Sequence, residues 1–393
     1  GDIYAIPEGT IVFPTEPLVR VKAPIMEAQI IEAALLNIIN HQSLIATKAA
    51  RVVWAAGGDP IMEFGLRRAQ GPDAGTYGAR AAIIGGCAGT SNVLTGKMFG
   101  VPILGTHAHS WVMSFPSEIE AFRHYAKTFP DACTFLVDTY DTLRSGVPNA
   151  IKVFQEMKDA GIELKNYGIR LDSGDLAYLS KKARKMLDEA GFTDAKITAS
   201  SDLDEYLIMS LKLQGAKINN WGVGTKLITS DDCPSFGGVY KLAAESDENG
   251  NFIPKIKLSN NPSKVTNPGI KKVLRFYDKA TGKIKADLIC LDDEVYSEDK
   301  KVKLFDHTAV WKKMVLHPGE YSIRELLVPV FINGECVYNS PCVTDIRAYC
   351  QKELNTLWDE HRRLANPHNV PVDLSDKLLD LKNKLIEEMS EEE

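Results

Sequence analysis

The chain has 393 residues, of which 44% are apolar and 25% are charged, and its net charge is -6. This length can bury more than one hydrophobic core, so two or three domains are expected. The acidic balance argues against general binding of nucleic acids or membrane surfaces, which favour a basic face, and no apolar run approaches the roughly 20 residues that span a bilayer.

The seven cysteines are scattered along the chain, and none forms a C-x-x-C pair. Their odd number and wide spacing favour reduced thiols over disulfides or a cysteine-based zinc site. The opening segment GDIYAIPEGT has neither the basic start nor the apolar core of a signal peptide. A cytoplasmic protein is therefore expected.

Residues 1–55 are predicted to form part of a β-rich domain followed by a helix. The segment 10–24 is rich in β-branched residues and proline, which is typical of short strands joined by turns. The segment 25–58 has apolar residues at helical spacing and ends at Gly57-Gly58, which predicts a helix. This helix is apolar on more than one side, so we expect it to be buried between layers.

Residues 56–235 change to short apolar runs that alternate with polar segments of helical period. Repeated strand–helix units of this length predict a parallel sheet and favour an irregular, TIM-like α/β barrel. The apolar runs are 101–104, 133–137, 167–171, 196–199 and 219–223, and the helical segments between them are 117–129, 147–161, 174–191 and 204–216.

Residues 236–393 are predicted to return to the β-rich domain and to end in helices. Strands are expected at 237–244, 283–287, 301–305 and 323–338. Two charged helices are expected at 345–363 and 374–393, with the acidic end as a solvated tail. The expected fold class is therefore α/β, with a barrel beside a β-rich domain formed from both ends of the chain and C-terminal helices.

Polar side chains follow every predicted barrel strand. In an α/β barrel, catalytic residues come from the carboxyl ends of strands and the loops after them. These positions hold Thr106, His107, His109, Ser110, Asp138, Arg170, Asp172, Ser173, Asp202, Asp204, Gly224, Thr225 and Lys226.

Several of these groups also have a purely structural interpretation. Asp172 or Ser173 could cap the next helix, and the segment SSDLDE at 200–205 allows the same. The segment GVGTK at 222–226 could be a tight turn. A glycine-rich loop before a helix, late in a barrel, can also bind a phosphate, and we favour that interpretation.

The segment GTHAHSW contains two histidines two residues apart, His107 and His109. Barrel metal hydrolases need further histidine ligands from later strands, and none lies at a strand end between 130 and 230, so no metal site made by protein side chains alone is expected. Asp138 at a neighbouring strand end could fix the tautomer of His109 and make its other nitrogen nucleophilic. If the strand continues, the two histidines point to opposite sides.

Six motifs, together and in order, resemble the nicotinate phosphoribosyltransferases of the longer bacterial type. The resemblance implies a type II phosphoribosyltransferase fold and an ATP-coupled reaction that joins nicotinate to phosphoribosyl pyrophosphate. The products are nicotinate mononucleotide and pyrophosphate, with ADP and phosphate from ATP, in NAD biosynthesis. The motifs are EFGLRRAQG (63–71), GTHAHSW (105–111), RLDSGDL (170–176), SSDLDE (200–205), GVGTKLITS (222–230) and GGVYKLA (237–243).

The resemblance also implies roles for single residues. His109 corresponds to the histidine that ATP phosphorylates, and Asp138 to its partner. Phe64 matches the aromatic residue that stacks on the pyridine ring, and Arg67 the arginine beside ring and ribose. The remaining implied positions are Arg170 and Asp172 near the base, Asp202 on the ribose hydroxyls, Gly222, Gly224 and Thr225 at the 5′-phosphate, and Thr106, Ser110 and Ser173 in the substrate site.

Ser91 and Asn92 bear on the choice of base. The related nicotinamide enzymes carry an aspartate in the segment that matches GTSNVL (89–94). A carboxylate there would repel nicotinate, so its absence favours the acid substrate. A nicotinamide-using relative and a non-catalytic nucleotide-binding fragment are the alternatives.

The resemblance further implies Mg²⁺ held through the substrate phosphates and a homodimer in which the neighbour completes each active site. Family members carry roughly ninety residues ahead of the part that matches Gly1, so the segment from Ile11 to Val21 is expected to lack strand neighbours. Weak or no activity is therefore expected for a chain that starts at Gly1.

Overall fold

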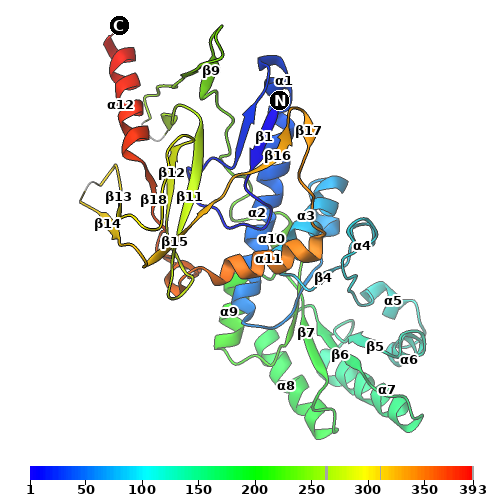
Figure 1. The fold of residues 1–393 in the computed structure, drawn as a ribbon. Coiled ribbons are helices and arrows are strands. Elements are labelled where there is room, and N and C mark those ends of the chain that lie inside the picture. The colour runs from blue at the N-terminus through cyan, green and yellow to red at the C-terminus, as the bar shows by residue number, and fades with distance from the viewer. Residues whose placement is uncertain (262–263, 310, 392–393) are drawn as a thin grey trace. The chain divides into compact units, whose positions relative to one another are not determined.

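The computed structural model describes residues 1–261, 264–309 and 311–391. The backbone forms two compact units (Figure 1). One unit, the β-rich unit, comprises Gly1–Ile38, Gly237–Pro341 and Ala348–Glu393. The other, the barrel unit, comprises Ile39–Phe236 and Cys342–Arg347.

The barrel unit is built on a six-stranded parallel sheet with the strand order β4-β3-β8-β7-β6-β5. Because β3 lies beside β8, the first strands meet the last and the sheet curls, with β4 and β5 as its two edges. The predicted α/β fold is confirmed, as a curled half-barrel. The strands are β3 (Ile61–Glu63), β4 (Gly89–Thr90), β5 (Ala132–Leu136), β6 (Asn166–Leu171), β7 (Lys196–Ala199) and β8 (Asn220–Val223).

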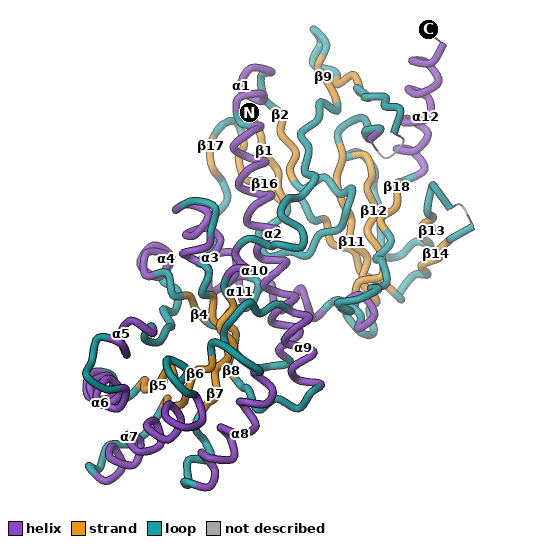
Figure 2. The backbone as a smooth tube through the Cα atoms, turned by 180° about the vertical axis from the view of Figure 1, so that it is seen from behind, coloured by secondary structure: helices purple, strands orange, loops and turns teal. Residues whose placement is uncertain are grey.

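The helices between these strands fulfil the predicted alternation. Helices α6 (Glu118–Thr128), α7 (Val147–Asp159), α8 (Leu176–Glu189) and α9 (Glu205–Leu213) follow one another around the sheet (Figure 2). Their apolar faces are buried, for example through Phe122, Phe154 and Leu187. The barrel unit also contains helices α3 (Pro72–Ile84), α4 (Val93–Phe99), α5 (His109–Met113) and α10 (Thr225–Ile228), and a single turn η1 (Leu66–Arg68).

Two expected strands are absent from the described residues at their predicted places. The run 101–104 makes only an isolated bridge from Ile103 to Thr90, so the prediction of a full strand is wrong. The segment 237–243 has no strand, and β9 (Ala244–Ser246) begins only at its end. In both segments too few residues find a backbone partner for a ladder to form.

The expected burial of the helix at 25–58 is also wrong for its first part. The segment divides into α1 (Ile25–Ile30), which has no buried residue, and α2 (Glu32–Ala56), whose buried residues begin at Leu44. Ile30 is 77% exposed. Apolar periodicity indicated a covered surface here, but periodicity cannot say which element covers it.

The β-rich unit contains two four-stranded sheets and two hairpins. The sheet β15-β11-β12-β18 carries the main core of this unit, which includes Leu274, Phe276 and Leu288. The strands of this unit are β1 (Asp2–Ala5), β2 (Val19–Lys22), β9, β10 (Phe252–Pro254), β11 (Lys271–Asp278), β12 (Ile284–Leu291), β13 (Val302–Phe305), β14 (Lys313–Leu316), β15 (Tyr321–Glu325), β16 (Val328–Ile332), β17 (Glu335–Cys336) and β18 (Val372–Leu374).

The predicted C-terminal helices are present but shorter. Helix α11 (Val343–Asn355) ends before 363 and is followed by a single turn, η4 (Asp359–His361). Helix α12 (Asp376–Glu391) corresponds to the helix predicted at 374–393. Residues 392 and 393 of that prediction lie outside the described residues.

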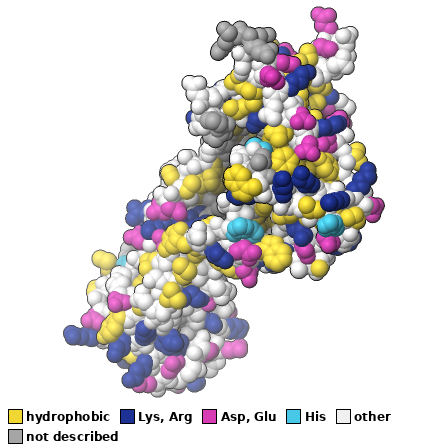
Figure 3. Space-filling view, turned by 90° about the vertical axis from the view of Figure 1, so that its left-hand side faces the viewer, with side chains coloured by type: hydrophobic (Ala, Val, Ile, Leu, Met, Phe, Trp, Pro, Cys, Tyr) yellow, Lys and Arg dark blue, Asp and Glu magenta, His cyan; other side chains and the backbone are white. Residues whose placement is uncertain are grey.

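No helix within the described ranges is long and apolar enough to cross a bilayer. On the face shown in Figure 3, Lys and Arg side chains are interspersed with Asp and Glu. This distribution matches the mixed composition of the chain rather than a surface of one sign.

Candidate functional site

His109 and Asp138 form the first contact of the site. The Nε2 atom of His109 lies 3.1 Å from Oδ1 of Asp138. The carboxylate can only accept, so Nε2 carries the proton and, in a neutral ring, Nδ1 keeps its lone pair. The His109 side chain is 41% exposed whereas that of Asp138 is 2% exposed. The imidazole of His109 is thus held near the surface by a buried acid.

Asp138 also binds the turn after β6. Its Oδ2 accepts hydrogen bonds from the backbone N–H of Asp172 at 3.0 Å and from Oγ of Ser173 at 2.5 Å. Asp172 in turn accepts a hydrogen bond from Oγ of Ser200, which follows β7. Hydrogen bonds of Asp138 and Asp172 therefore link the loops that follow β5, β6 and β7.

Phe64 lies at the end of β3, against the neighbouring strand β8. Its backbone N–H donates to the carbonyl of Val223 at 2.8 Å. A methyl group at Gly222 would lie 2.6 Å from two ring carbons of Phe64 and 3.5 Å from Cβ of Ser200. Gly222 therefore makes room for the aromatic ring, a role that the phosphate-loop interpretation did not include.

Arg170 comes from β6 and reaches back to the histidine loop. Its Nη1 donates to Oγ1 of Thr106, which donates to the carbonyl of His107 at 3.3 Å. Burial lowers the pKa of Arg170, while Asp172 and Asp138 act in the opposite direction, and the guanidinium remains charged at neutral pH. Its Nε is buried and has no hydrogen-bond partner among the described residues.

The structure decides which residues cap the helices. Asp175, not Asp172 or Ser173, caps α8 through a 2.9 Å hydrogen bond from the N–H of Tyr178. Asp204 caps α9 by accepting from the N–H of Leu207 at 2.7 Å. The capping alternative is thus rejected for Asp172 and Ser173.

Asp202 lies in an unusual turn between β7 and α9. Asp202 and the preceding Ser201 have φ angles of 41° and 101°, a left-handed region that is costly for residues with side chains. Asp202 is exposed. A strained, exposed carboxylate beside the Asp172–Ser200 contact is typical of a functional turn.

The loop after β8 leads into the short helix α10. Gly224 precedes it and Thr225 is its first residue. The ammonium of Lys226 is 2.8 Å from Oδ2 of Asp204. This ion pair joins the ends of β7 and β8, and it raises the pKa of Lys226.

The segment after β4 contributes less than expected. The Asn92 side chain is buried, accepting from the N–H of Thr95 at 3.2 Å and donating to the carbonyl of Gly75 at 3.3 Å. Its amide is thus used to cap α4. Ser91 at the same strand end remains a candidate, and exposed Arg67 lies in η1 after β3. Ser110, the second residue of α5, is exposed.

His107 differs from His109 in its burial. It is 7% exposed, and burial lowers its pKa to about 4. The strand that would have set the two histidines on opposite sides does not form, because α5 begins at His109. His107 is a buried, neutral imidazole.

Glu63 is a buried residue that the sequence reasoning missed. It is fully buried at the end of β3, and its carboxylate accepts hydrogen bonds from the N–H of Gly65 and, at 2.6 Å, from Oγ1 of Thr90. Thr90 accepts a further bond from the N–H of Asn92 at 2.9 Å. Glu63 therefore ties the turn after β3 to the turn after β4. The sequence signal that could have indicated this role is an acidic residue at the end of an otherwise apolar strand.

The described residues contain no group of three or more His, Cys, Asp or Glu side chains arranged to hold a metal ion.

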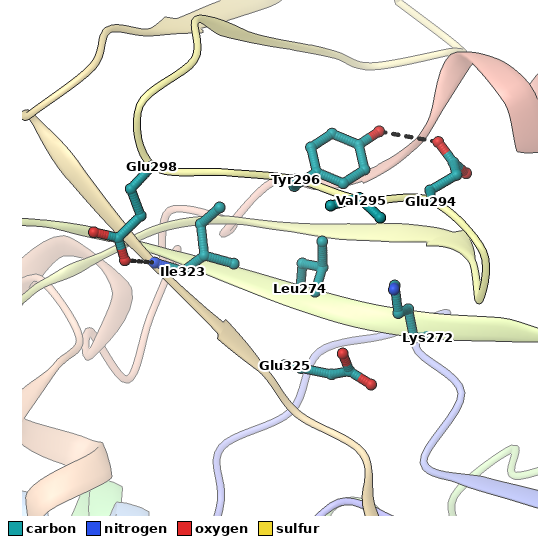
Figure 4. A pocket seen from close by; sticks show the side chains of 8 residues that line it. All are labelled: Lys272, Leu274, Glu294, Val295, Tyr296, Glu298, Ile323 and Glu325. Atoms are coloured by element: carbon teal, nitrogen blue, oxygen red, sulfur yellow. Dashed lines mark hydrogen bonds between the residues drawn. The ribbon is translucent and has the colours of Figure 1, made fainter.

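A cavity of about 400 Å³ lies in the β-rich unit, over β11 and β15 (Figure 4). Two of its acids are already engaged, because Glu294 accepts from the Tyr296 hydroxyl at 3.2 Å and Glu298 from the N–H of Ile323 at 3.0 Å. The residues described above at the ends of the barrel strands do not line this cavity.

A curled parallel sheet with an acid–imidazole pair and further carboxylates at its strand ends defines an α/β half-barrel enzyme. Residues 60–235 match the nicotinate phosphoribosyltransferase (NAPRTase) family, and residues 270–382 match its C-terminal domain. The nicotinate phosphoribosyltransferase of Bacillus subtilis (strain 168) is 51% identical over 99% of this chain and 80% of that protein. The chain belongs to the nicotinate phosphoribosyltransferase family, so the resemblance of the motifs is confirmed.

More distant relatives agree. The nicotinate phosphoribosyltransferase of Dictyostelium discoideum is 38% identical over 98% of this chain and 72% of its own length. The crystal structure of human nicotinic acid phosphoribosyltransferase matches with a TM-score of 0.81 and 29% identity, over 98% of this chain and 82% of that chain. A nicotinate-nucleotide pyrophosphorylase from Pyrococcus furiosus shares the fold, with a TM-score of 0.69 over 90% of this chain and 80% of that chain, at 24% identity.

Proposed function

We propose that this chain joins nicotinate to phosphoribosyl pyrophosphate, with ATP hydrolysis, and forms nicotinate mononucleotide for NAD biosynthesis. The observation that carries the proposal is the run of contacts from His109 through Asp138 and Asp172 to Ser200, next to which Gly222 leaves room for the Phe64 ring. It brings a reactive imidazole, two carboxylates and a flat ring to one rim, in a chain of this family.

His109 is the proposed phosphate carrier. Its Nδ1 lone pair attacks the γ-phosphorus of ATP, the bond from that phosphorus to the ADP oxygen breaks, and ADP leaves with its electron pair. Asp138 keeps the proton on Nε2 and offsets the positive charge that the ring acquires. Later transfer of the phosphoryl group to water restores the neutral imidazole.

Phe64 and the arginines are proposed to hold the base and its carboxylate. A pyridine ring stacks favourably on an aromatic side chain. Arg170 and Arg67 supply positive charge for nicotinate and for the substrate phosphates. Nicotinate is preferred over nicotinamide because Ser91 and Asn92 bring no carboxylate to this end of the sheet.

Asp172 and Asp202 are proposed to stabilise the positive charge that builds on the anomeric carbon as pyrophosphate departs. The backbone at Gly222 and Gly224 and the hydroxyl of Thr225 are proposed to bind the 5′-phosphate. Thr106, Ser110 and Ser173 complete the substrate site. Magnesium would be held by substrate phosphates and would offset their charge.

We also propose a homodimer in the cytoplasm. Helix α1 exposes Ile25, Met26 and Ile30 by 60%, 76% and 77%, and a second copy would cover such apolar side chains. The seven cysteines are all unpaired, which suits a reducing compartment. Light scattering at two protein concentrations tests the dimer.

Phosphate mapping after incubation with γ-labelled ATP tests the central step. The parent chain is expected to carry acid-labile phosphate on His109, and His109→Ala is expected to carry none. His124→Ala, an exposed histidine on α6, is the control and is expected to label normally. Label that survives in His109→Ala would refute the assignment.

A second assay separates the alternatives for the substrate. Pyrophosphate release with nicotinate or nicotinamide as the base is compared under the same conditions. Faster release with nicotinamide would favour the amide-using alternative. Binding of nicotinate mononucleotide by calorimetry without any pyrophosphate release would instead indicate a binding protein.

A further inference from the structure

His107 makes a hydrogen bond that the proposed reaction does not use. Its Nε2 lies 3.2 Å from the backbone N of Leu136, which donates. The proton of the neutral ring is therefore on Nδ1, which lies 3.4 Å from the carbonyl of Ala108. The ring packs against Tyr125 and Phe122 of α6, at 4.7 and 6.0 Å between centroids, so its orientation is fixed.

The N–H of Leu136 needs this acceptor because β5 is an edge strand. Val137 donates to Arg170 on β6, and successive N–H groups of a strand alternate in direction. The N–H of Leu136 thus points to the open side of the sheet, where β4 does not reach. Leu136 is fully buried, so losing the acceptor would leave a buried donor unsatisfied.

The two histidines pair with the end of β5 in register. His107 meets Leu136 and His109 meets Asp138, so both contacts join residues that are 29 apart in the chain. Within the described part of the chain, Gly105, Thr106 and His107 make no backbone–backbone hydrogen bond outside helices and strands. Side chains therefore hold this segment, through Thr106 to Arg170 and through His107 to β5.

We propose that His107 is a positioning residue for His109. As a neutral acceptor for Leu136, it holds the segment 107–109 beside 136–138, so that His109 meets Asp138 with Nδ1 directed outward. The proposal rests on the proposed phosphorylation of His109 and adds the residue that sets its geometry.

The electrostatics support a permanent acceptor. Burial lowers the pKa of His107 to about 4, nearby Arg170 and His109 lower it further, and the bond to Ala108 acts in the opposite direction. A protonated ring has no lone pair to accept from Leu136. The contact therefore persists at neutral pH.

Two substitutions at position 107 distinguish the effect of the hydrogen-bond acceptor from the effect of the volume of the ring. His107→Gln places an amide oxygen near the position of Nε2, whereas His107→Phe keeps an aromatic ring without an acceptor. His124→Phe is the matched control, since it makes the same substitution at an exposed position. The His124 ring lies on α6 and stacks on Phe115. Each variant is compared with the parent by single-turnover phosphorylation from labelled ATP, amide exchange at Leu136 and nitrogen NMR of the His109 ring.

We expect His107→Phe to slow phosphorylation roughly tenfold to a hundredfold, since small displacements of reacting groups have effects of this size. Hydrogen exchange at the backbone amide of Leu136 should accelerate. The His109 ring should become a mixture of its two neutral tautomers instead of carrying the proton on Nε2 alone. His107→Gln and His124→Phe should remain within a few-fold of the parent. If His107→Phe does not fold, His107→Gln decides: a normal rate with a protected Leu136 supports the proposal, and a slow rate with a protected Leu136 overturns it.

Normal phosphorylation in a folded His107→Phe variant would overturn the proposal, as would equal impairment in the phenylalanine and glutamine variants with Leu136 unchanged. If the parent itself accepts no phosphate, the proposed function fails instead. The exchange and NMR measurements still decide the positioning role in that case, because they need no turnover.

Discussion

The imidazole of His109 and the carboxylate of Asp138 are joined through Nε2 and Oδ1 at 3.1 Å, and the same carboxylate binds the next strand end through Asp172 and Ser173. Asp138 is thus a shared anchor for two loops. Its substitution tests tautomer control and loop geometry together.

Asp138→Asn is expected to lower the rate of nicotinate mononucleotide formation roughly a hundredfold or more, because an amide can present its NH₂ group to Nε2 and favour the wrong tautomer. The rate is measured as pyrophosphate release at saturating substrates. Ser173→Ala removes only one of the three bonds to Asp138 and should cost far less. Equal losses in the two variants would argue that loop position, rather than the tautomer, dominates.

Gly222→Ala is expected to raise the KM for nicotinate roughly tenfold, because the added methyl would lie 2.6 Å from the Phe64 ring and displace it. The KM for ATP should change much less, since His109 lies at the other end of the run of contacts. Gly237→Ala is the control, because a methyl there meets nothing within 4 Å. An unchanged KM for nicotinate would contradict the place given to Phe64.

Glu63→Gln is expected to lower the free energy of unfolding by about 1–3 kcal/mol, because an amide cannot accept from both Gly65 and Thr90 and places a donor against one of them. Chemical denaturation measures the loss. The exposed residue Glu163 provides the control, and Glu163→Gln should stay within about 0.5 kcal/mol of the parent. Similar behaviour of the two variants would show that Glu63 does not tie the turns together.

The lowered pKa of His107 predicts a loss of stability in acid. The folded-state pKa, about 4, lies below that of an unfolded histidine, about 6.5. The stability from the neutral ring is therefore fully present above about pH 6.5 and is lost as the pH falls toward 4. Melting temperatures of the parent should fall more steeply over this window than those of His107→Gln. Parallel curves would contradict the assignment of a neutral ring.

The periodic segments of the chain were predictable because they record local physics. The strand–helix alternation from 133 to 223 follows from apolar runs and amphipathic helices, and the structure contains each element. The motifs around Phe64, His109 and Asp172 also identified the family. In contrast, the run 101–104 failed as a strand because a ladder needs a partner, and β5 does not come beside it.

Sequence by itself determined the class of fold, the family and the residues at the strand ends, because composition, spacing and motif are local properties of the chain. Only the tertiary structure decided how those residues are used. It made Asp175 and Asp204 the caps, buried Glu63 between two turns, and turned His107 toward the open edge of β5. These outcomes depend on which distant groups become neighbours, and the pairing of buried donors and acceptors is settled only when the sheet has curled.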